Sequence, residues 1–262
     1  MIVDEIPRIA AHDDATIDRV ITGAEPAIFV GIADAWPARG WTLDELARRG
    51  AGCMVTMTRT RDDRLLLGDS GLVQERIGLD AFIRTRLTTP NAEPDALGGY
   101  VMAPWDELPD ALARAVPVPA RMARSPLVRR KLWISRAGTM SPLHRDMPHN
   151  LLVQLLGRKT LWLAAPGEAR NVYPYSFLSG APNLAHADLE RPDLERWPRS
   201  ARVHARVGTI EPGEAVFIPS MWWHQVRSDS TSVSVNIWWG EGKSLLIAGA
   251  AELVKRVRGL SR

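Results

Sequence analysis

The feature that most constrains the fold is a succession of short apolar segments in the second half of the chain. Gly, Pro and Asp separate them, so each run is too short for a long helix and suits a buried strand. Many short strands at regular spacing are typical of an antiparallel barrel or sandwich. The segments are residues 131–135, 150–156, 159–165, 202–207, 214–220 and 231–239.

The first half of the chain mixes short helices with strands. Apolar runs predict strands over residues 27–33 and 53–58. Thr42 and Glu45 have the spacing of a capping box, which predicts that a helix begins there. The other predicted elements are helices over 13–21, 78–87 and 105–116 and a loop over 90–99.

A helix is predicted at the end of the chain, over residues 244–260, because apolar residues recur there at helical spacing. It is too apolar for a solvated tail, so it either packs on the barrel or forms a subunit interface, and a homodimer is one expectation. No linker divides the chain. We therefore predict one domain, 1–262, with N-terminal elements (1–130), a barrel core (131–240) and this helix.

Composition excludes several classes. With 45% hydrophobic and 24% charged residues, the 262-residue chain is of the globular type and not a disordered one. The single cysteine allows no intrachain disulfide, and the acidic start has no apolar core of a signal peptide, which predicts a cytoplasmic setting. No apolar run reaches membrane-spanning length. The net charge of +3 is too small to argue for nucleic-acid binding.

The segment that contains the candidate metal-binding residues is SPLHRDMPHN, residues 141–150. His144 and Asp146 are two residues apart, so on an extended segment both side chains point to one face. His224, which follows a strand and a Pro turn, would complete a set of two histidines and one carboxylate, a set that suits non-haem Fe(II). The His-x-Asp tripeptide alone is weak evidence for a metal site, because a surface His beside an Asp in a turn has the same sequence.

Further spaced motifs accompany this tripeptide. Asn150 comes six residues after His144, and a Gly-Arg-Lys sequence ends at Lys159. Far downstream, a Pro precedes Trp-His224, and a Val-Asn-Ile-Trp strand follows at 235–238. In this order the motifs resemble the JmjC and cupin-like 2-oxoglutarate oxygenases, and most of all the subgroup of the asparaginyl hydroxylase of hypoxia-inducible factor. The resemblance covers most of residues 25–240.

The resemblance implies a mainly β (α+β) fold, a double-stranded β-helix or cupin jelly-roll barrel with flanking helices and a C-terminal helix. It implies that Fe(II) is held by His144, Asp146 and His224, and that 2-oxoglutarate is a cofactor. The residues it places near 2-oxoglutarate are Lys159 and Ser141 at the distal carboxylate, Asn150 and Asn236 near the metal-bound end, Tyr100 by a loose alignment, and Trp238.

Several of these residues have a second interpretation. Lys159 alternates with apolar residues on one strand face, so it either pairs with an anion or extends to the barrel rim. Tyr100 fits a core tyrosine equally well. Tryptophan supplies 10 of the 17 aromatic residues, and four lie close to the distal motif. They are expected to form an apolar wall beside the metal or simply part of the core: Trp222, Trp223, Trp238 and Trp239.

The first functional interpretation is a hydroxylase of a peptide or protein side chain, since JmjC demethylases mostly carry Glu where Asp146 stands. A small-molecule oxygenase of natural-product biosynthesis is the second. A cupin-like binding protein with a non-catalytic metal site, or a Zn-dependent hydrolase or isomerase, comes next. Arg145 would place positive charge at the mouth of the site, which favours a substrate with a carboxylate. The insertion at 167–200 contains no sequence motif that indicates the substrate.

Overall fold

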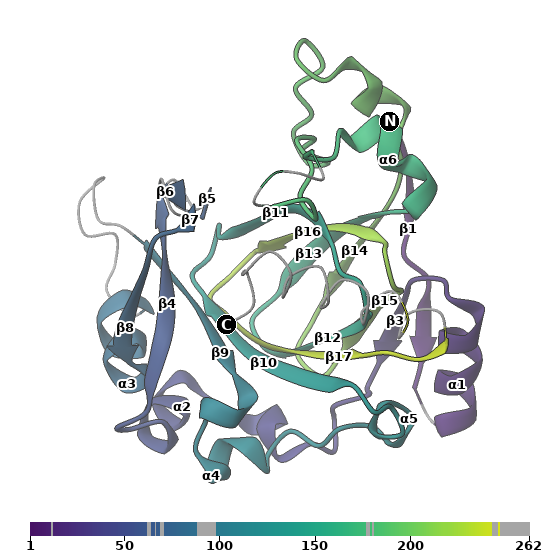
Figure 1. The fold of residues 1–262 in the computed structure, drawn as a ribbon. Helices are drawn as coiled ribbons and strands as arrows, with labels where there is room; N and C mark the ends of the chain where they lie inside the picture. Colours follow the sequence, from purple (N-terminus) through teal and green to yellow (C-terminus); the bar gives the residue numbers. More distant parts are fainter. Residues whose placement is uncertain are drawn as a thin grey trace.

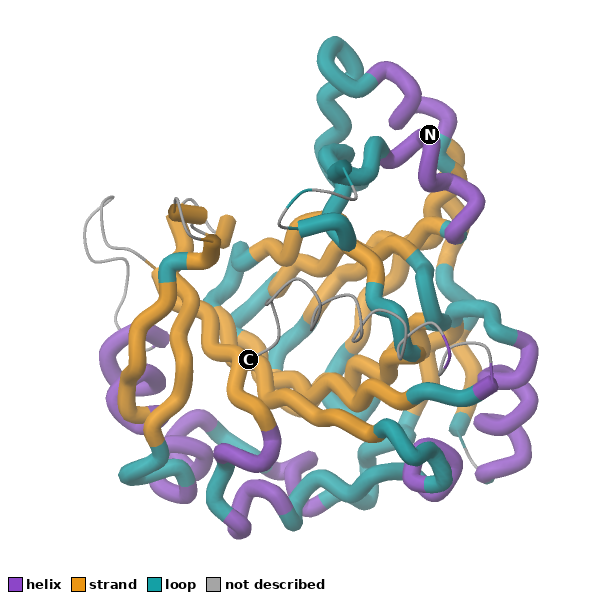
Figure 2. Tube along the Cα trace, in the orientation of Figure 1, coloured by secondary structure: helices purple, strands orange, loops and turns teal. Residues whose placement is uncertain are grey.

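The computed structural model describes residues 1–11, 13–61, 64–65, 67–68, 71–87, 98–176, 179, 181–242 and 246. Strands dominate it (Figures 1 and 2). They are β1 Ile2–Glu5, β2 Arg8–Ala10, β3 Ala27–Val30, β4 Met54–Arg61, β5 Arg64–Leu65, β6 Leu67–Gly68, β7 Gly71–Leu72, β8 Gln74–Gly78, β9 Gly98–Pro104, β10 Val128–Ser135, β11 Met140–Arg145, β12 His149–Leu156, β13 Lys159–Ala164, β14 His204–Ile210, β15 Ala215–Ile218, β16 Trp223–Ser228 and β17 Ser232–Trp239.

Short helices flank the strands and lie mostly on one side of the barrel, below β10 and β17 in the view of Figure 2. The α-helices are α1 Asp14–Gly23, α2 Leu43–Arg49, α3 Leu79–Phe82, α4 Asp110–Ala113, α5 Ala120–Ala123 and α6 Ala169–Val172. A π-turn, η2 Ile83–Leu87, continues α3. The 3-10 turns are η1 Pro37–Gly40, η3 Trp105–Glu107, η4 Pro166–Glu168 and η5 Pro198–Arg202.

All strands except β6 and β7 form one continuous sheet that curls on itself, in the order β1-β14-β13-β16-β11-β5-β4-β9-β10-β17-β12-β15-β3-β2, with β8 beside β4. Strands β6 and β7 pair with each other in a separate sheet. Most neighbours are antiparallel, whereas β1 and β14, β2 and β3, and β5 and β11 pair in parallel. The layer of β11, β16, β13 and β14 faces the layer of β10, β17, β12 and β15 across the barrel (Figure 1). This arrangement confirms the mainly β, jelly-roll fold class.

Strand β17 shows how the sequence pattern builds the barrel. Val233, Val235 and Ile237 are fully buried and belong to a core cluster that also contains residues of α2 and α3. Burial of each such side chain contributes about 1.5–3 kcal/mol. The alternate residues, among them Asn236 and Trp238, therefore point to the other face, into the barrel. The helices thus cover the outer face of this layer and leave its inner face for the site.

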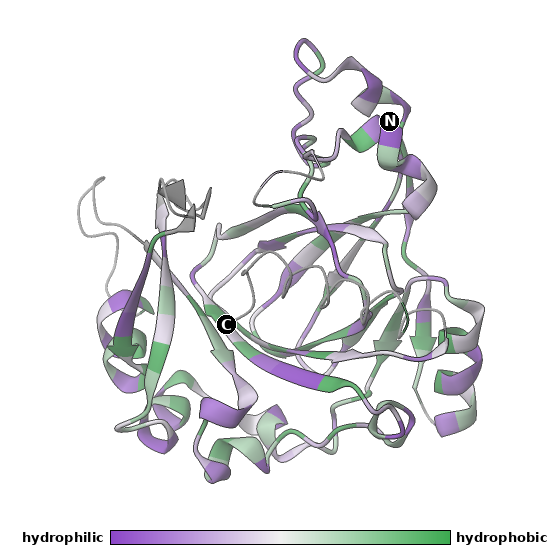
Figure 3. Ribbon diagram, in the orientation of Figure 1, coloured by the Kyte–Doolittle hydropathy of each residue, from purple (hydrophilic) through white to green (hydrophobic). Residues whose placement is uncertain are grey.

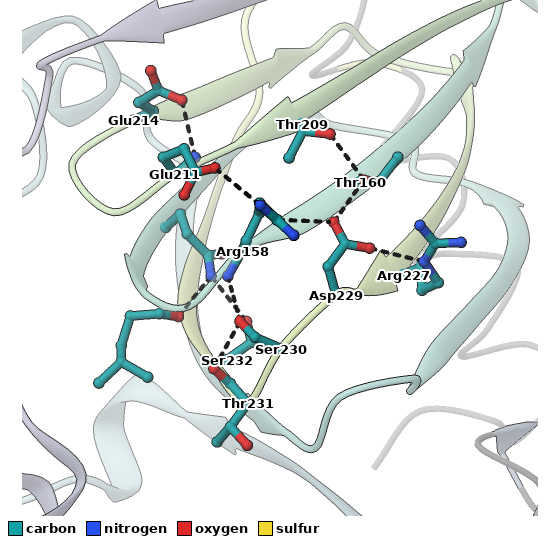
Figure 4. Close-up of polar contacts among 12 residues, drawn as sticks. Arg158, Thr160, Thr209, Glu211, Glu214, Arg227, Asp229, Ser230, Thr231 and Ser232 are labelled. Carbon is teal, nitrogen blue, oxygen red and sulfur yellow. Dashed lines mark hydrogen bonds and ion pairs between the residues drawn. The ribbon is translucent and has the colours of Figure 1, made fainter.

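Polar contacts on the outside of the other layer fix the register of β13 (Figure 4). The Thr160 hydroxyl contacts Thr209 Oγ1 at 2.9 Å and donates to Asp229 Oδ2 at 2.7 Å. Arg227 Nε donates to Asp229 Oδ1 at 2.8 Å. Because neighbours on a strand point to opposite faces, this outward Thr160 directs Lys159 into the barrel.

The prediction of a continuous helix over residues 105–116 is wrong. The chain forms a 3-10 turn, η3, and the single turn of α4 in its place. Pro109 stands between them with φ −56°, and Leu108 before it is extended at φ −88° and ψ 147°. A residue before proline is disfavoured in the helical region, so Pro109 interrupts the helix.

Other predicted elements have mixed outcomes. The helices over 13–21 and 78–87 are confirmed by α1 and by α3 with η2. The capping box is confirmed because the backbone N–H of Glu45 donates to Thr42 Oγ1 at 3.2 Å. Nearly all of the predicted loop over 90–99 and of the closing helix over 244–260 lies outside the described residues. Within the described part of the chain, no helix has the length and apolar character needed to cross a membrane.

Candidate metal centre

Two adjacent strands bring the three ligand-type side chains together. His144 on β11 is directly opposite His224 on β16 in antiparallel register, and their ring centroids are 4.0 Å apart. Asp146 follows His144 by two residues and places its Oδ2 3.6 Å from His224 Nε2. One ligand atom from each residue lies within 4.8 Å of the other two. The register and the two-residue spacing therefore produce a compact set of two imidazoles and one carboxylate.

Backbone carbonyls select the tautomer of both imidazoles. His144 Nδ1 lies 2.8 Å from the carbonyl oxygen of Pro142, and His224 Nδ1 lies 3.1 Å from that of Trp222. A carbonyl oxygen only accepts, so each Nδ1 carries the proton and donates it. Each Nε2 then keeps its lone pair, which is the form that binds a metal ion.

Asp146 is held by hydrogen bonds from the facing layer of the barrel. The Trp238 indole Nε1–H donates to Asp146 Oδ2 at 2.7 Å, and Asn150 Nδ2 donates to the same atom at 3.1 Å. Asn236 Nδ2 in turn donates to Asn150 Oδ1 at 2.8 Å. This chain of contacts orients the carboxylate, because such outer partners fix the position of a metal ligand.

The surroundings favour the deprotonated forms of His224 and Asp146. Burial lowers the pKa of His224 to about 4, with the neighbouring His144 adding to the effect. Burial by itself would raise the pKa of Asp146, but the two histidines and the hydrogen bonds from Trp238 and Asn150 lower it on balance. Neutral imidazole and ionised carboxylate are the protonation states that a cation requires.

Lys159 is the second unusual group in the barrel. Its side chain comes from β13, is only 3% exposed, and reaches across to β17, where Nζ donates to Ser234 Oγ at 2.8 Å. No carboxylate among the described residues pairs with it, and burial lowers the pKa of Lys159 to about 7. A buried ammonium without an anion is costly, so this position is suited to an anionic ligand.

We expect the metal-free protein to gain stability as the pH rises above 7. The folded-state pKa of Lys159 lies below the ordinary value of about 10.4, so the unfolded chain binds more protons between these values. The free energy of unfolding should therefore rise by about 2 kcal/mol from pH 7 to pH 9. Urea unfolding of the wild type and of Lys159→Met measures this, and equal slopes against pH in the two proteins would contradict it.

Ser141 and Tyr100, the other predicted contacts of the distal carboxylate, lie together. The Tyr100 hydroxyl is 3.4 Å from Ser141 Oγ, and burial raises the pKa of Tyr100 against a smaller lowering by that contact. The phenol is therefore neutral and available as a donor. Hydrogen bonds thus link Asn150, Asn236 and Trp238 to Asp146, whereas Ser141 contacts Tyr100 and Lys159 contacts Ser234.

Two residues that the sequence reasoning missed belong to this interior. Ser234 holds the Lys159 ammonium. Trp133 on β10 stands opposite Ser234 in the register, between Tyr100 at 5.2 Å and Trp238 at 6.2 Å between ring centroids. Its Nε1–H is buried with no hydrogen-bond partner in the described structure. The position of Trp133 on one face of the predicted strand over 131–135 is the sequence feature that indicates this role.

Several predicted neighbours of the site lie elsewhere. Of the four tryptophans near His224, only Trp238 hydrogen-bonds a triad residue through its side chain, since Trp222 contacts His224 through its backbone carbonyl. Trp223 and Trp239 are fully buried in separate core clusters. Arg145 pairs with Trp223 in the register, and its guanidinium lies 4.6 Å from that ring. It therefore faces away from the triad, which corrects the expected charge at the mouth.

Replacing Trp238 by Phe is expected to weaken Fe(II) binding about 10- to 100-fold, because Asp146 loses its shortest hydrogen bond. Trp239→Phe is the matched control. The Trp239 Nε1–H has no partner in the described structure, so this variant should lose stability but keep its Fe(II) affinity. Calorimetric titration with Fe(II) under anaerobic conditions gives both affinities. Equal affinities in the two variants would exclude the proposed role of the indole N–H.

Comparison with known proteins agrees with this fold. The family model of the cupin-like domain matches residues 14–244, which is most of the chain. The chain belongs to the cupin-like domain family.

Relatives of this cupin-like domain carry JmjC names. It is 30% identical over 223 residues to lysine-specific demethylase 8 of Danio rerio, covering 82% of this chain and 53% of that protein. It is 42% identical over 111 residues to Jumonji C domain-containing protein 5 of Drosophila melanogaster, covering 42% and 27%. Against tRNA wybutosine-synthesizing protein 5 of Gallus gallus it is 33% identical over 128 residues, covering 49% and 39%.

This cupin-like domain therefore spans about half or less of the length of these relatives. Their names support the JmjC resemblance at the level of the domain. The narrower resemblance to the asparaginyl hydroxylase of hypoxia-inducible factor stays a prediction.

Proposed function

We propose that this chain is an Fe(II)- and 2-oxoglutarate-dependent dioxygenase that hydroxylates a C–H bond of a peptide or protein side chain. One observation carries the proposal. A cluster of two histidines and one aspartate shares a barrel interior with a buried lysine that pairs with no carboxylate among the described residues. The first feature fits a metal with open positions, and the second fits a dicarboxylate.

The donor set fits Fe(II). His144, Asp146 and His224 would hold the ion through two Nε2 atoms and one carboxylate, and three protein ligands leave further positions for other molecules. A structural zinc site would use four protein ligands. Among the described residues, these three form the only cluster of His, Cys, Asp or Glu side chains close enough to share an ion.

The second half of the site fits 2-oxoglutarate. Lys159 would bind the distal carboxylate, because a charged partner offsets the cost of burying its ammonium. Ser141 and Tyr100 would add hydroxyl donors to the same carboxylate. Asn150 and Asn236 lie at the other end, next to Asp146, and would hold the metal-bound end.

When bound, Fe(II) and 2-oxoglutarate supply the activation of O₂ that converts a C–H bond to an alcohol with release of succinate and CO₂. The chain's own residues orient the metal ligands and shield the barrel interior. Trp238 and Asn150 hold the Asp146 carboxylate, the backbone carbonyls hold both imidazoles, and the rings of Tyr100 and Trp133 keep the interior apolar.

A protein substrate is supported by the relatives' coverage. The two relatives named lysine-specific demethylase 8 match more than four fifths of this chain, whereas the tRNA wybutosine-synthesizing protein matches about half. Asp146 stands where the demethylases that the motif resembles mostly carry Glu, which favours a stable alcohol product over demethylation. A small-molecule substrate is the alternative outcome of the test.

The test combines co-substrate turnover with product mass. We expect succinate release that requires Fe(II) and 2-oxoglutarate. With ¹⁸O₂ and a mixture of peptides and metabolites, we expect the labelled oxygen on a peptide. Label on a metabolite would select the small-molecule alternative. Absence of both succinate formation and anaerobic 2-oxoglutarate binding would contradict the oxygenase itself.

The homodimer and the cytoplasmic setting stay predictions. Residues 244–260, which are proposed to pair two chains, lie outside the described part of the structure except for residue 246. Light scattering on the full chain and on a chain ending at residue 242 tests the pairing. A dimer that becomes a monomer on truncation supports it, and the same mass per particle in both samples contradicts it.

A further inference from the structure

The insertion between β13 and β14 forms a lobe, residues 166–203, that stands above β11 and β16 (Figure 1). The lobe mixes hydrophilic and hydrophobic residues along its length (Figure 3). It is joined to the metal-ligand strand by backbone contacts. His144 and Leu184 form an isolated β-bridge, and the N–H of Ala185 donates to the carbonyl of Leu143 at 2.9 Å. The lobe is therefore joined directly to β11, the strand that carries His144.

Four aromatic side chains line up on this lobe. Tyr175 and His186 stack at 4.0 Å between ring centroids, and His186 and Trp197 stack at 4.6 Å. Tyr173 lies at 4.9 Å from Trp197. Although His186 is exposed, it lies between two rings, so the row is ordered before any ligand arrives. A pocket of about 490 Å³ opens here, and we call it the lobe pocket; its wall includes Arg170, Tyr173, Pro174, His186, Trp197 and Arg199.

The charge of the lobe pocket is positive. Arg170 and Arg199 are exposed, and neither forms an ion pair with the residues that the structure describes. The Arg199 guanidinium lies over the Tyr173 ring at 4.2 Å, which orients it toward the aromatic row. Two cations beside apolar rings select a ligand that carries a carboxylate next to an apolar group.

The charge balance of the whole lobe disfavours a nucleic acid. Residues 166–203 contain five Arg and five Asp or Glu, which leaves no net positive field for a phosphate backbone. The positive charge is confined to one small pocket. An acidic side chain of a peptide suits this arrangement better than a polyanion.

The lobe pocket is close enough to the triad for one short peptide to reach both. The N–H of Tyr175 donates to the carbonyl of Leu184 at 2.9 Å, and Leu184 bridges to His144. Each of these two pairings spans about one strand spacing, so the backbones of Tyr175 and His144 are about 10 Å apart. Tyr175 directly follows Pro174 in the wall of the lobe pocket. An extended peptide covers that distance in about three residues.

We propose that the lobe pocket docks an acidic side chain and an adjacent apolar one of the peptide substrate, about three residues from the residue that is oxidised. This inference rests on the proposed function, since it names the chemistry of the substrate's flanking segment. Its binding step needs neither Fe(II) nor 2-oxoglutarate, so it can be measured apart from turnover.

The test measures binding of fluorescent ten-residue peptides to the full chain by anisotropy. One peptide contains Asp-Leu-Glu-Trp-Asp in a Gly-Ser background, and its counterpart has Lys at each acidic position. We expect the acidic peptide to bind more tightly. The double variant Arg170→Gln, Arg199→Gln should bind it about tenfold more weakly, because two charge pairs are lost. Arg48→Gln, an exposed arginine on α2, is the matched control and should bind as the wild type does.

Each outcome decides the question. Equal binding of the two peptides, or no change in the double variant, would overturn the proposal. Tighter, Arg170-dependent binding of a ten-nucleotide single-stranded RNA would overturn it in favour of a nucleic-acid substrate. His144→Ala should still bind the acidic peptide. If it does while the wild type shows neither succinate release nor anaerobic binding of 2-oxoglutarate, the oxygenase proposal fails and the docking site stands.

Discussion

Lys159→Met is expected to make the protein more stable and at the same time to abolish its use of 2-oxoglutarate. The pKa of Lys159 falls from its ordinary value near 10.5 to about 7, which corresponds to roughly 5 kcal/mol against burying the ammonium. Met has a similar length and no charge, so it removes this cost and loses one hydrogen bond to Ser234. A net gain of a few kcal/mol should raise the melting temperature of the metal-free protein by about 5 °C or more.

The same substitution removes the group proposed to hold the distal carboxylate. Losing one partner of a buried ion pair costs about 3–5 kcal/mol, so 2-oxoglutarate affinity should fall about 10²- to 10⁴-fold. Calorimetric titration of the Mn(II)-loaded protein measures this affinity, and differential scanning measures the melting temperature.

Arg158→Met is the matched control for this prediction. Arg158 precedes Lys159 but is exposed, with Glu211 and Asp229 at 3.9 and 3.7 Å. Exposed pairs contribute about 0–1 kcal/mol, so this variant should be slightly less stable and bind 2-oxoglutarate normally. A Lys159→Met protein that melts lower than the wild type, or that still binds 2-oxoglutarate as tightly, would contradict the role assigned to the ammonium.

His144→Ala is expected to remove bound Fe(II) and to reduce succinate release by at least about a hundredfold. Removing an outer hydrogen-bond partner of a metal ligand already costs 10- to 100-fold, and loss of a ligand itself exceeds that. His144 is half-buried and outside the main core clusters, so the variant should fold. Metal content by mass spectrometry and succinate formation are the two measurements.

His204→Ala is the control for this second prediction. His204 lies on β14, is exposed, and pairs with Asp4 at 2.6 Å, away from the triad. It should keep one Fe(II) per chain and full turnover. If His144→Ala also kept one Fe(II) per chain with unchanged turnover, the ion would have to be bound elsewhere.

The fold could be predicted where side-chain alternation is strong. On β17, Val233, Val235 and Ile237 against Ser234, Asn236 and Trp238 define both the strand and its inward face. Strand β16 could not be predicted in this way, because Trp223–Ser228 has no apolar run and gains its order from its neighbours β11 and β13. The apolar spacing over 105–116 indicates a helix, but Pro109 excludes Leu108 from the helical region and divides the segment into η3 and α4.

In the site, too, local features could be predicted from the sequence, whereas contacts between distant strands could not. The two-residue spacing of His144 and Asp146 is local, so the sequence indicates their shared face. The position of His224 opposite His144 depends on the register of two strands that are far apart in the chain. Ser234, which contacts Lys159, comes from the opposite layer of the barrel, and no local pattern links the two. Contacts of this kind require the fold.

A crystal structure with Mn(II) and 2-oxoglutarate bound tests the central claim most directly. We predict one Mn(II) bound by His144, Asp146 and His224, and a 2-oxoglutarate whose distal carboxylate lies within hydrogen-bond distance of Lys159 Nζ. A metal at another place, or a dicarboxylate bound away from Lys159 while its ammonium stays with Ser234 alone, would contradict the account.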